Sequence, residues 1–424
     1  MIRILKIGEV PNDEIFARTS PTASVSGVVS DIIAAVRADG DRALFSLCEK
    51  FDGARLTSLE VTKAELDSAE TSLEPEFLQV LETAASNIRA FHSNQVRSGF
   101  ICAEKNGVVT GQRIIPLGCV AIYVPGGTAA YPSTVLMDAI PAKLAGCGQI
   151  VMATPPRADG TLPPAILAAA KLAGVDRIFK VGGAQAVAAL AYGTETIPRA
   201  DKIVGPGNAY VAEAKRQVFG QVSIDMIAGP SEILIVADGT CEPRFLAADL
   251  LSQAEHDKMA SAVLVTDSVS LAEQVRDEIE KQIVLLDRRD IARASIDNNG
   301  KIIVAPSIGS AVEIANDIAP EHLELCVDNP FDLLGSVRNA GSVFMGKNCP
   351  EALGDYLAGP NHTLPTGGTA RFSSPLSVDD FVKKTQYIYY TRDALAAVAD
   401  DVALFASHEG LTGHAASAVI RTEE

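Results

Sequence analysis

Short apolar runs alternate with alanine-rich stretches through the middle of the chain. The apolar runs read as strands and the stretches between them as helices. In the first half of this region the strand-like runs are residues 119–124, 150–153 and 177–181, and the helical stretches are residues 133–145, 164–173 and 184–192. Continuous apolar strands separated by helices are typical of a parallel sheet that is covered on both faces.

The same alternation returns further along the chain. Here the predicted strands are residues 233–237, 262–266, 301–305 and 342–345, and the predicted helices are residues 243–256, 271–286 and 308–316. Two similar modules in tandem predict an α/β fold with two Rossmann-like parallel-sheet domains. We expect a crevice between them, where ligands of such sheets bind.

The two ends of the chain show other patterns. Residues before 119 are mostly helical, with a conspicuous amphipathic stretch at 81–92. The piece after Arg371 is too short to bury a core of its own, so we expect it to pack on something else. The whole chain has 424 residues, which is too long for one ordinary core and implies two or more domains.

Composition narrows the class of protein. The chain is 47% hydrophobic but only 5% aromatic, without tryptophan, which suits α/β layers rich in alanine, valine and isoleucine. No apolar run reaches the length of a membrane-spanning helix, and residues 1–9 lack the features of a secretory signal. We therefore expect a cytoplasmic protein without a membrane partner.

Charge and cysteine usage add two exclusions. A formal net charge of −17 argues against nucleic acid as a partner, because phosphates demand a basic surface. It leaves a cationic small molecule open. The seven cysteines are odd in number and scattered without a C-x-x-C pair, which indicates reduced thiols and no cysteine zinc finger.

The most informative segment runs from Gly229 to Asp257. It reads as a loop, a strand, a turn and a helix that begins near Pro243, where we expect Asp238 or Thr240 to cap the helix. Gln253 and His256 then lie on neighbouring positions of one helix face and could form half of a metal site. The alternative is a polar last turn, in which His256 is favoured by the helix dipole.

Other polar contexts hold candidate partners for this pair. Glu321 and His322 follow a proline, and Asp355 and His362 lie in a loop rich in glycine and proline. Glu409 and His414 lie near the C-terminus. Zinc takes about four nitrogen, oxygen or sulfur ligands. Asp355 and His414 would complete a set with the helical pair.

Several long strings make the chain similar to the histidinol dehydrogenase family over nearly its whole length. They are Tyr123-Val-Pro-Gly-Gly, Gly182-Gly-Ala-Gln-Ala, Val204-Gly-Pro-Gly-Asn, Ile224-Asp-Met-Ile-Ala-Gly-Pro-Ser-Glu, Gln253-Ala-Glu-His-Asp, Ala319-Pro-Glu-His and Gly359-Pro-Asn-His-Thr-Leu-Pro. Strings of this length and low degeneracy do not match by chance.

The resemblance implies oxidation of L-histidinol through L-histidinal to L-histidine with two NAD⁺. An alcohol oxidation needs a base, a role that suits His322, which we expect on a loop. Glu321 is the candidate to activate water for the aldehyde step, with His322 assisting. Without the family, a helix-capping glutamate and a packed histidine would explain this pair equally well.

The resemblance also implies one zinc per subunit, which positions the substrate without redox work. The implied ligands are Gln253, His256, Asp355 and His414. The implied substrate contacts are Ser231, Gln253, His256, Glu321, His322, Asp355, His362, Glu409 and His414. We expect His92 and His408 to be structural. Manganese or cobalt in place of zinc stays open.

No sequence fingerprint announces the nicotinamide cofactor. The chain lacks a G-x-G-x-x-G after a strand, and the turns at Gly182 and Gly205 read alone as ordinary strand-to-helix turns. Only the resemblance assigns NAD contacts, to Tyr123, Gln185 and Asn208.

The resemblance further implies a homodimer with shared active sites, in which the tail brings His414 and Glu409 to the neighbouring subunit. The expected domains are an arm at 1–25, a discontinuous α/β domain from 26–118 with 233–370, a NAD-contacting domain at 119–232 and a dimerisation tail at 371–424.

Three other functions and one other mechanism for the aldehyde step are less consistent with the sequence. A related dehydrogenase of another amino or hydroxy alcohol would lose substrate contacts such as His362 and Glu409. A zinc hydrolase would use Glu321 and metal-bound water without NAD, and a non-catalytic binding protein would have no use for a base. A covalent thiohemiacetal route needs a reactive cysteine, which no motif here supplies.

Overall fold

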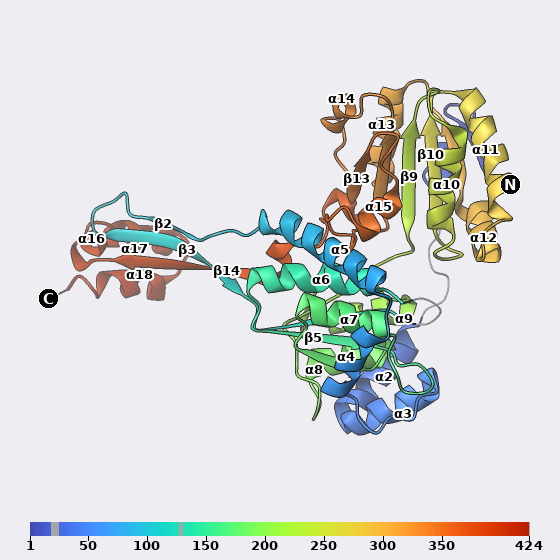
Figure 1. Ribbon diagram of the computed structural model, residues 1–424. Helices are drawn as coiled ribbons and strands as arrows, with labels where there is room; N and C mark the ends of the chain where they lie inside the picture. The colour runs from blue at the N-terminus through green and yellow to red at the C-terminus, as the bar shows by residue number, and fades with distance from the viewer. Residues whose placement is uncertain (18–24, 127–129, 424) are drawn as a thin grey trace. The chain divides into compact units, whose positions relative to one another are not determined.

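The computed structural model describes residues 1–17, 25–126 and 130–423, and these form two compact units (Figure 1). Unit 1 comprises residues 1–95 and 118–381, and unit 2 comprises residues 96–117 and 382–424. Part of the expected N-terminal arm and Gly127 of the first glycine string lie outside the described residues.

One parallel sheet of unit 1 follows the first predicted module. Its strands are β4 (Cys119–Tyr123), β5 (Gln149–Thr154), β6 (Arg177–Lys180), β7 (Lys202–Val204) and β8 (Ser223–Ile224), in the order β6-β5-β4-β7-β8. The helices are α6 (Pro132–Ala145), α7 (Pro164–Ala173), α8 (Gly183–Tyr192) and α9 (Ala209–Val218). The first three strands and helices confirm the prediction to within about two residues.

The second sheet of unit 1 has six parallel strands. They are β1 (Arg3–Lys6), β9 (Glu232–Ala237), β10 (Ser261–Thr266), β11 (Lys301–Val304), β12 (His322–Cys326) and β13 (Ser342–Met345), in the order β1-β11-β10-β9-β12-β13. From β9 onward the order matches that of the first sheet, strand for strand. The expected pair of Rossmann-like sheets is therefore confirmed.

Helices cover both faces of the second sheet (Figure 1). They are α10 (Pro243–Ala254), α11 (Val269–Ile283), α12 (Arg289–Asn299), α13 (Ile308–Ile318), α14 (Phe331–Leu334) and α15 (Glu351–Tyr356). Ile233 and Ile235 of β9 pack in one core with α10, α11 and α12. The alternate residues Leu234 and Val236 pack in another with α13, as the period of two along a strand requires.

Two local predictions in this sheet are wrong. His322 does not lie on a loop but begins β12, which pairs with β9 and β13. Glu324 in the middle of that strand hid it in the sequence, although this carboxylate is buried and accepts a hydrogen bond from the Glu351 N–H at 2.9 Å. The capping residue of α10 is Glu242, without a side-chain bond.

Asp238 and Thr240 instead serve the turn before α10. Oδ1 of Asp238 accepts hydrogen bonds from the backbone N–H and the hydroxyl of Thr240. At its other end α10 stops at Ala254, so His256 follows in a turn, where its N–H donates to the carbonyl of Gln253 at 3.2 Å. Both side chains still leave the same end of α10.

The N-terminal helices divide differently from the expected domains. They are α1 (Asn12–Ile15), α2 (Ser26–Asp39), α3 (Asp41–Asp52), α4 (Lys63–Thr71) and α5 (Pro75–Ser93). Val29 of α2 and Leu44 of α3 are buried in one core with Phe179 and Val187 of the first sheet's layers. Residues 26–52 therefore pack with the module of the first sheet, because their apolar faces meet its helices, and not with residues 233–370.

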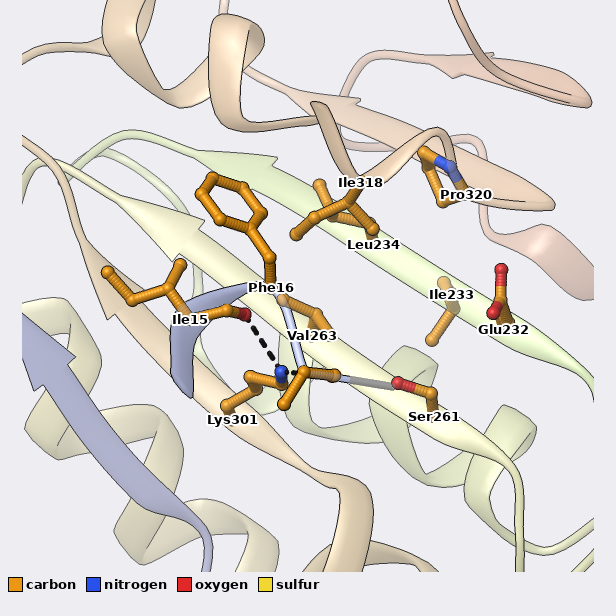
Figure 2. A pocket seen from close by; sticks show the side chains of 11 residues that line it. Ile15, Phe16, Glu232, Ile233, Leu234, Ser261, Val263, Lys301, Ile318 and Pro320 are labelled. Carbon is orange, nitrogen blue, oxygen red and sulfur yellow. Dashed lines mark hydrogen bonds between the residues drawn. The ribbon is translucent and has the colours of Figure 1, made fainter. Parts of the chain in front are cut away.

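The first residues are not a free arm. β1 adds a strand to the second sheet by pairing in parallel with β11. Lys301 at the start of β11 is buried, and its Nζ donates hydrogen bonds to the carbonyl oxygens of Ile15 and Ala17, each at 2.8 Å (Figure 2). Since a buried ammonium group needs acceptors, Lys301 fastens this segment to the sheet.

Unit 2 is a small α/β body. Its antiparallel sheet has the order β14-β3-β2, formed by β2 (Phe100–Cys102), β3 (Val108–Pro116) and β14 (Val382–Tyr390). The helices α16 (Arg392–Ala396), α17 (Ala399–His408) and α18 (Thr412–Val419) follow. The tail thus shares its sheet with residues 96–117. It begins after Phe381, not at Arg371, because the 3₁₀ turns η1 (Thr369–Arg371) and η2 (Val378–Phe381) belong to unit 1.

Among the described residues, no helix combines the length and apolar character that crossing a membrane would require.

Candidate functional site

The imidazole of His322 is held at the amino end of β12, inside unit 1. Its Nδ1 lies 3.0 Å from the carbonyl oxygen of Glu232 at the amino end of the neighbouring strand β9. A carbonyl only accepts, so this bond places the proton on Nδ1 and leaves a lone pair on Nε2. Nε2 is buried and has no hydrogen-bond partner within the described residues.

The backbone of Glu232, which binds His322, also binds Glu321. Its Oε2 accepts a hydrogen bond from the N–H of Glu232 at 2.9 Å and lies 3.6 Å from Nδ1 of His322. Burial raises the pKa of Glu321 well above its ordinary value, although the bond from Glu232 acts to lower it. Burial also lowers the pKa of His322, to about 4. The imidazole is therefore neutral near neutral pH, with Nε2 unprotonated.

A second acid–base pair lies beside the first. Oδ1 of Asp355, in α15, is 3.4 Å from Nδ1 of His362. Burial acts to raise the pKa of Asp355, but the hydrogen bond from His362 and the nearby His322 and His256 hold it at about 2. Burial acts to lower the pKa of His362, but Asp355 outweighs it, so the pKa is raised. The two side chains form a buried ion pair.

The end of α10 contributes an unsatisfied oxygen. Gln253 is 1% exposed, and its Oε1 has no hydrogen-bond partner among the described residues. A buried amide oxygen left without a donor costs free energy unless a ligand completes it. Such an atom fits a metal or a substrate group.

His256 and Asp355 open on one cavity of about 300 Å³. Its remaining wall comes mainly from α5 and the start of α6, and its lining residues include Phe77, Val80, Leu81, Tyr131, Leu136, Arg288 and Tyr356. Arg288 also donates to the carbonyl of His256 at 3.3 Å. The cavity thus joins an apolar wall to two of the predicted ligands.

The structure brings Glu351 into the site, although no sequence motif indicated this residue. Among the described residues, His322, Glu351 and Asp355 offer ligand atoms within 4.8 Å of one another. Oε1 of Glu351 lies 3.7 Å from Nε2 of His322. Glu351 and Asp355 are four residues apart, which puts them on one face of a helix, and that spacing could have revealed the pair.

Ser231 lies next to this centre in the chain, directly before Glu232. Its carbonyl accepts a hydrogen bond from the N–H of Ser261 at 2.9 Å. In the same loop, the N–H of Gly229 donates to Oγ1 of Thr366 at 2.6 Å, which ties the loop to the segment that carries His362. The two predicted substrate loops are therefore joined.

The histidines outside this centre divide into two groups. His92 is fully buried on α5, and its Nδ1 lies 2.7 Å from Oε1 of Gln95, which agrees with a structural role. Three candidate residues are exposed in unit 2: His408 ends α17, His414 lies on α18, and Glu409 lies between the two helices. The structural role expected for His408 and the part in the site expected for Glu409 and His414 stay predictions.

The predicted NAD contacts all follow carboxyl ends of strands in the first sheet. Tyr123 ends β4, and its hydroxyl accepts a hydrogen bond from the Gly183 N–H at 3.0 Å. Gln185 lies in the first turn of α8 and is 2% exposed. Asn208 caps α9, where its Oδ1 accepts from the N–H of Tyr210 at 3.0 Å and of Val211 at 3.2 Å.

Only glycine fits at position 205, where the loop before Asn208 begins. Gly205 has a φ of 111°, and a Cβ there would stand 2.1 Å from the carbonyl oxygen of Tyr123. Its N–H donates to Asp225 at 2.7 Å and its carbonyl accepts from Nζ of the buried Lys215 at 2.9 Å. These hydrogen bonds hold the loop between β7 and α9, close to the end of β4, where a phosphate could approach a helix N-terminus.

Known proteins match this chain over the residues of both units. A family model described as histidinol dehydrogenase matches residues 17–422. Histidinol dehydrogenase of Clostridium acetobutylicum is 53% identical over 426 residues and covers 99% of each chain. That of Listeria monocytogenes serovar 1/2a is 54% identical over 406 residues, with 96% of this chain and 95% of its own covered. The crystal structure of histidinol dehydrogenase from Elizabethkingia anophelis aligns with a TM-score of 0.94 at 38% identity, over 99% of this chain and 98% of that one.

Proposed function

The chain belongs to the histidinol dehydrogenase family, and from that premise we propose that it oxidises L-histidinol through L-histidinal to L-histidine with two NAD⁺, in the cytoplasm. The observation that carries the proposal is the centre at the amino ends of β9 and β12. There a neutral imidazole presents an unpartnered nitrogen beside a carboxylate and an orphaned amide oxygen. A dehydrogenase needs the base, and a cationic substrate suits the acids.

In the alcohol step, His322 takes the hydroxyl proton at Nε2. The bond from Nδ1 to the carbonyl of Glu232 keeps that nitrogen in its accepting form. NAD⁺, when bound, would accept the hydride from the substrate carbon. A positioned base of this kind contributes roughly 10²–10⁴-fold to a rate.

In the aldehyde step, Glu321 activates the water that adds to the carbonyl, and His322 assists. A carboxylate with a raised pKa is a stronger base than an exposed one, and the N–H of Glu232 at 2.9 Å supports its ionised form. The backbone of one residue therefore holds both bases, which keeps them at a fixed separation.

Zinc is the proposed metal, held by Gln253, His256 and Asp355 together with His414 of a second subunit. The orphaned Oε1 of Gln253 and the shared cavity of His256 and Asp355 fit that donor set. When bound, zinc would hold the imidazole and amino nitrogens of the substrate, without redox work, because Zn²⁺ is d¹⁰. Ser231, His362 and Glu409 are the further proposed substrate contacts.

NAD is assigned to the carboxyl edge of the first sheet. Tyr123 and the loop from Gly205 to Asn208 lie where the strand order reverses between β4 and β7, the usual ligand position of such sheets. Gln185 of α8 is the third proposed contact.

The reaction is tested by absorbance of NADH with purified protein, added zinc, histidinol and NAD⁺. Two NADH per histidinol, with histidine as product, are expected. A zinc hydrolase would form no NADH. A dehydrogenase of another amino alcohol would reduce NAD⁺ with that alcohol and leave histidinol untouched.

A separate experiment tests the shared site. Two inactive variants, His256→Asn and His414→Asn, are mixed under conditions that exchange subunits. Hybrid dimers would hold one intact and one doubly damaged site, so recovery should approach roughly a quarter of wild-type activity. Verified hybrids without activity would place His414 in the site of its own subunit and refute the dimer-crossing tail.

A further inference from the structure

Helix α6 contains an interruption that its sequence creates. Pro141 lies inside the helix and has no N–H. The carbonyl of Met137, four residues earlier, therefore has no donor within the helix. Met137 is fully buried, so this oxygen has no access to water, and leaving it unsatisfied would cost free energy.

A side chain from a distant loop supplies the missing donor. Nδ2 of Asn361 donates a hydrogen bond to the carbonyl oxygen of Met137 at 2.6 Å. Asn361 is itself 4% exposed, and its Oδ1 accepts from the N–H of Thr363 at 2.8 Å. The amide is thereby oriented from both ends.

The next residue of α6 makes a second contact with the same loop. Asp138 is fully buried, and its Oδ1 accepts a hydrogen bond from the hydroxyl of Thr363 at 2.8 Å. Asn361 and Thr363 flank His362 in the chain. The loop is thus fastened to α6 on both sides of the histidine that pairs with Asp355.

The same part of α6 lies against the proposed nucleotide loop. A Cβ added to Gly205 would stand 3.1 Å from Oδ2 of Asp138. One carboxyl group of α6 therefore contacts Thr363 beside His362 and faces the glycine that precedes Asn208.

We propose that the interrupted turn of α6, Met137 to Pro141, is a socket that positions His362 for binding histidinol. Asn361 and Thr363 are its positioning residues, and Asp138 is the acceptor that Thr363 needs. The inference rests on the proposed function, since it takes His362 as a substrate contact. The socket joins the loop that carries His362 to a helix of the module to which NAD is assigned. It thereby fixes the position of His362, the proposed histidinol contact, relative to the proposed NAD site.

The decisive comparison is between removing a hydrogen bond and removing bulk. Thr363→Val keeps the shape but deletes the donor, and Asn361→Ala leaves the carbonyl of Met137 unsatisfied. Each should raise KM for histidinol roughly tenfold, the size expected for one buried hydrogen bond. KM for NAD⁺ should stay within about twofold. Thr363→Ser retains the hydroxyl and should restore the wild-type KM for histidinol.

A double variant separates positioning from stability. Asp138→Leu combined with Thr363→Val replaces both partners by apolar groups, a change that can be nearly neutral for folding. Its Tm should recover toward the wild-type value while KM for histidinol stays raised. Recovery of both quantities together would show that the pair acts only through stability and would overturn the proposal.

Hydrogen exchange gives a readout that does not depend on the reaction. In Asn361→Ala, peptides that span residues 357–366 should exchange faster, while peptides from α8 and α11 should not change. If the wild type fails to oxidise histidinol, the proposed function fails but this measurement still tests the socket. Unchanged exchange in the loop, or a KM for histidinol within about twofold of wild type in both Thr363→Val and Asn361→Ala, would refute it.

Discussion

The two parallel sheets of unit 1 share one strand order but use opposite edges. In the first sheet, β5 and β6 are added on one side of β4, and β7 and β8 are added on its other side. In the second sheet, β10 and β11 are added on one side of β9, and β12 and β13 on its other side. Both orders reverse at one place, between β4 and β7 and between β9 and β12. The proposed NAD loops follow the carboxyl ends of strands, whereas the proposed catalytic pair, Glu321 and His322, lies at amino ends.

Side chains cross-link the carboxyl edge of the second sheet. Nζ of Lys347 donates to Oδ1 of Asp328 at 2.6 Å and to the carbonyl and hydroxyl of Thr240, which bridges the chain after β12 to the chain after β9. This cross-link lies at the reversal of strand order between β9 and β12, as the glycine loop of the first sheet lies at the reversal between β4 and β7. Strand order therefore locates a site along a sheet, but the loop sequences decide which edge is open.

The amino edge of the second sheet gains its groups from returning helices. Because β9 and β10 are parallel, α10 between them must run back to the amino edge, and it ends there with Gln253 and His256. Glu232 begins β9 and offers an N–H to Glu321 and a carbonyl to His322. The proposed catalytic and metal-binding residues therefore lie where the end of α10 meets the starts of β9 and β12.

The largest expected effect comes from His322, the proposed base at that amino edge. His322→Asn should lower kcat for histidinol oxidation by about 10²–10⁴-fold, the usual contribution of a general base. KM for NAD⁺ should hardly change, since the cofactor is assigned to the other sheet. A large rise in that KM, with kcat preserved, would place His322 in cofactor binding instead.

Glu321→Gln sharpens the same point by dividing the two half-reactions. It keeps the shape of the side chain but removes the base for water, so histidinal oxidation should slow by about 10²-fold or more. Histidinol oxidation should slow less. Single-turnover assays started from each substrate measure the two steps, and equal losses would contradict the assignment of separate bases.

The next effect concerns the metal at the end of α10. His256→Asn should weaken zinc binding about 100-fold and abolish most activity, because losing one of four ligands leaves an incomplete site. His408→Asn is the matched control, since it changes an exposed histidine outside the proposed set. Zinc content by elemental analysis after dialysis decides the matter. Full occupancy in His256→Asn would show that the ligand set is different.

These expectations also show what the sequence could predict. The two parallel sheets follow from the spacing of apolar runs, and the helical ranges around Ala169 and Ala189 are correct because alanine-rich stretches between strands leave few alternatives. β12 was not predicted, because Glu324 breaks its apolar pattern and is satisfied only by a backbone N–H from α15. Strands whose polar residues are paired by distant segments cannot be found from local pattern.

The site, like the fold, could be predicted from the sequence only in part. Residue types and the family strings pointed to Glu321, His322, Asp355 and His362, which the structure brings together. The sequence could not show that Glu232 holds the first two by its backbone, because a backbone contact leaves no signature in residue type. Nor could it show which core the N-terminal helices join, since an amphipathic helix does not specify its partner.

A smaller effect is expected at the carboxyl edge of the first sheet. Asn208→Ala should raise KM for NAD⁺ about tenfold and leave zinc content unchanged, if its amide contacts the cofactor. The substitution also removes the cap of α9, so Ser307→Ala, which removes the cap of α13, is the matched control. An equal rise of that KM in Ser307→Ala would show that cap loss alone explains the effect.

The smallest expected effect concerns Glu351, a buried carboxyl group beside His322, and whether it is protonated in the folded chain. Burial, and then the neighbouring Asp355, raise the pKa of Glu351 from 4.5 to about 8. Between these values the folded chain holds a proton that the unfolded chain has lost, so stability falls as pH rises through this window. Glu351→Gln cannot ionise. In metal-free protein its Tm should therefore exceed that of the wild type by roughly 2–4 °C near pH 9, and the gap should close near pH 5. Glu313→Gln is the control, because the pKa of exposed Glu313 is lowered by Arg338 and lies below the window. Calorimetry in the presence of a chelator measures both variants, and parallel curves of Tm against pH for wild type and Glu351→Gln would mean that Glu351 is ionised in the fold, with His322 beside it as the group that compensates its charge.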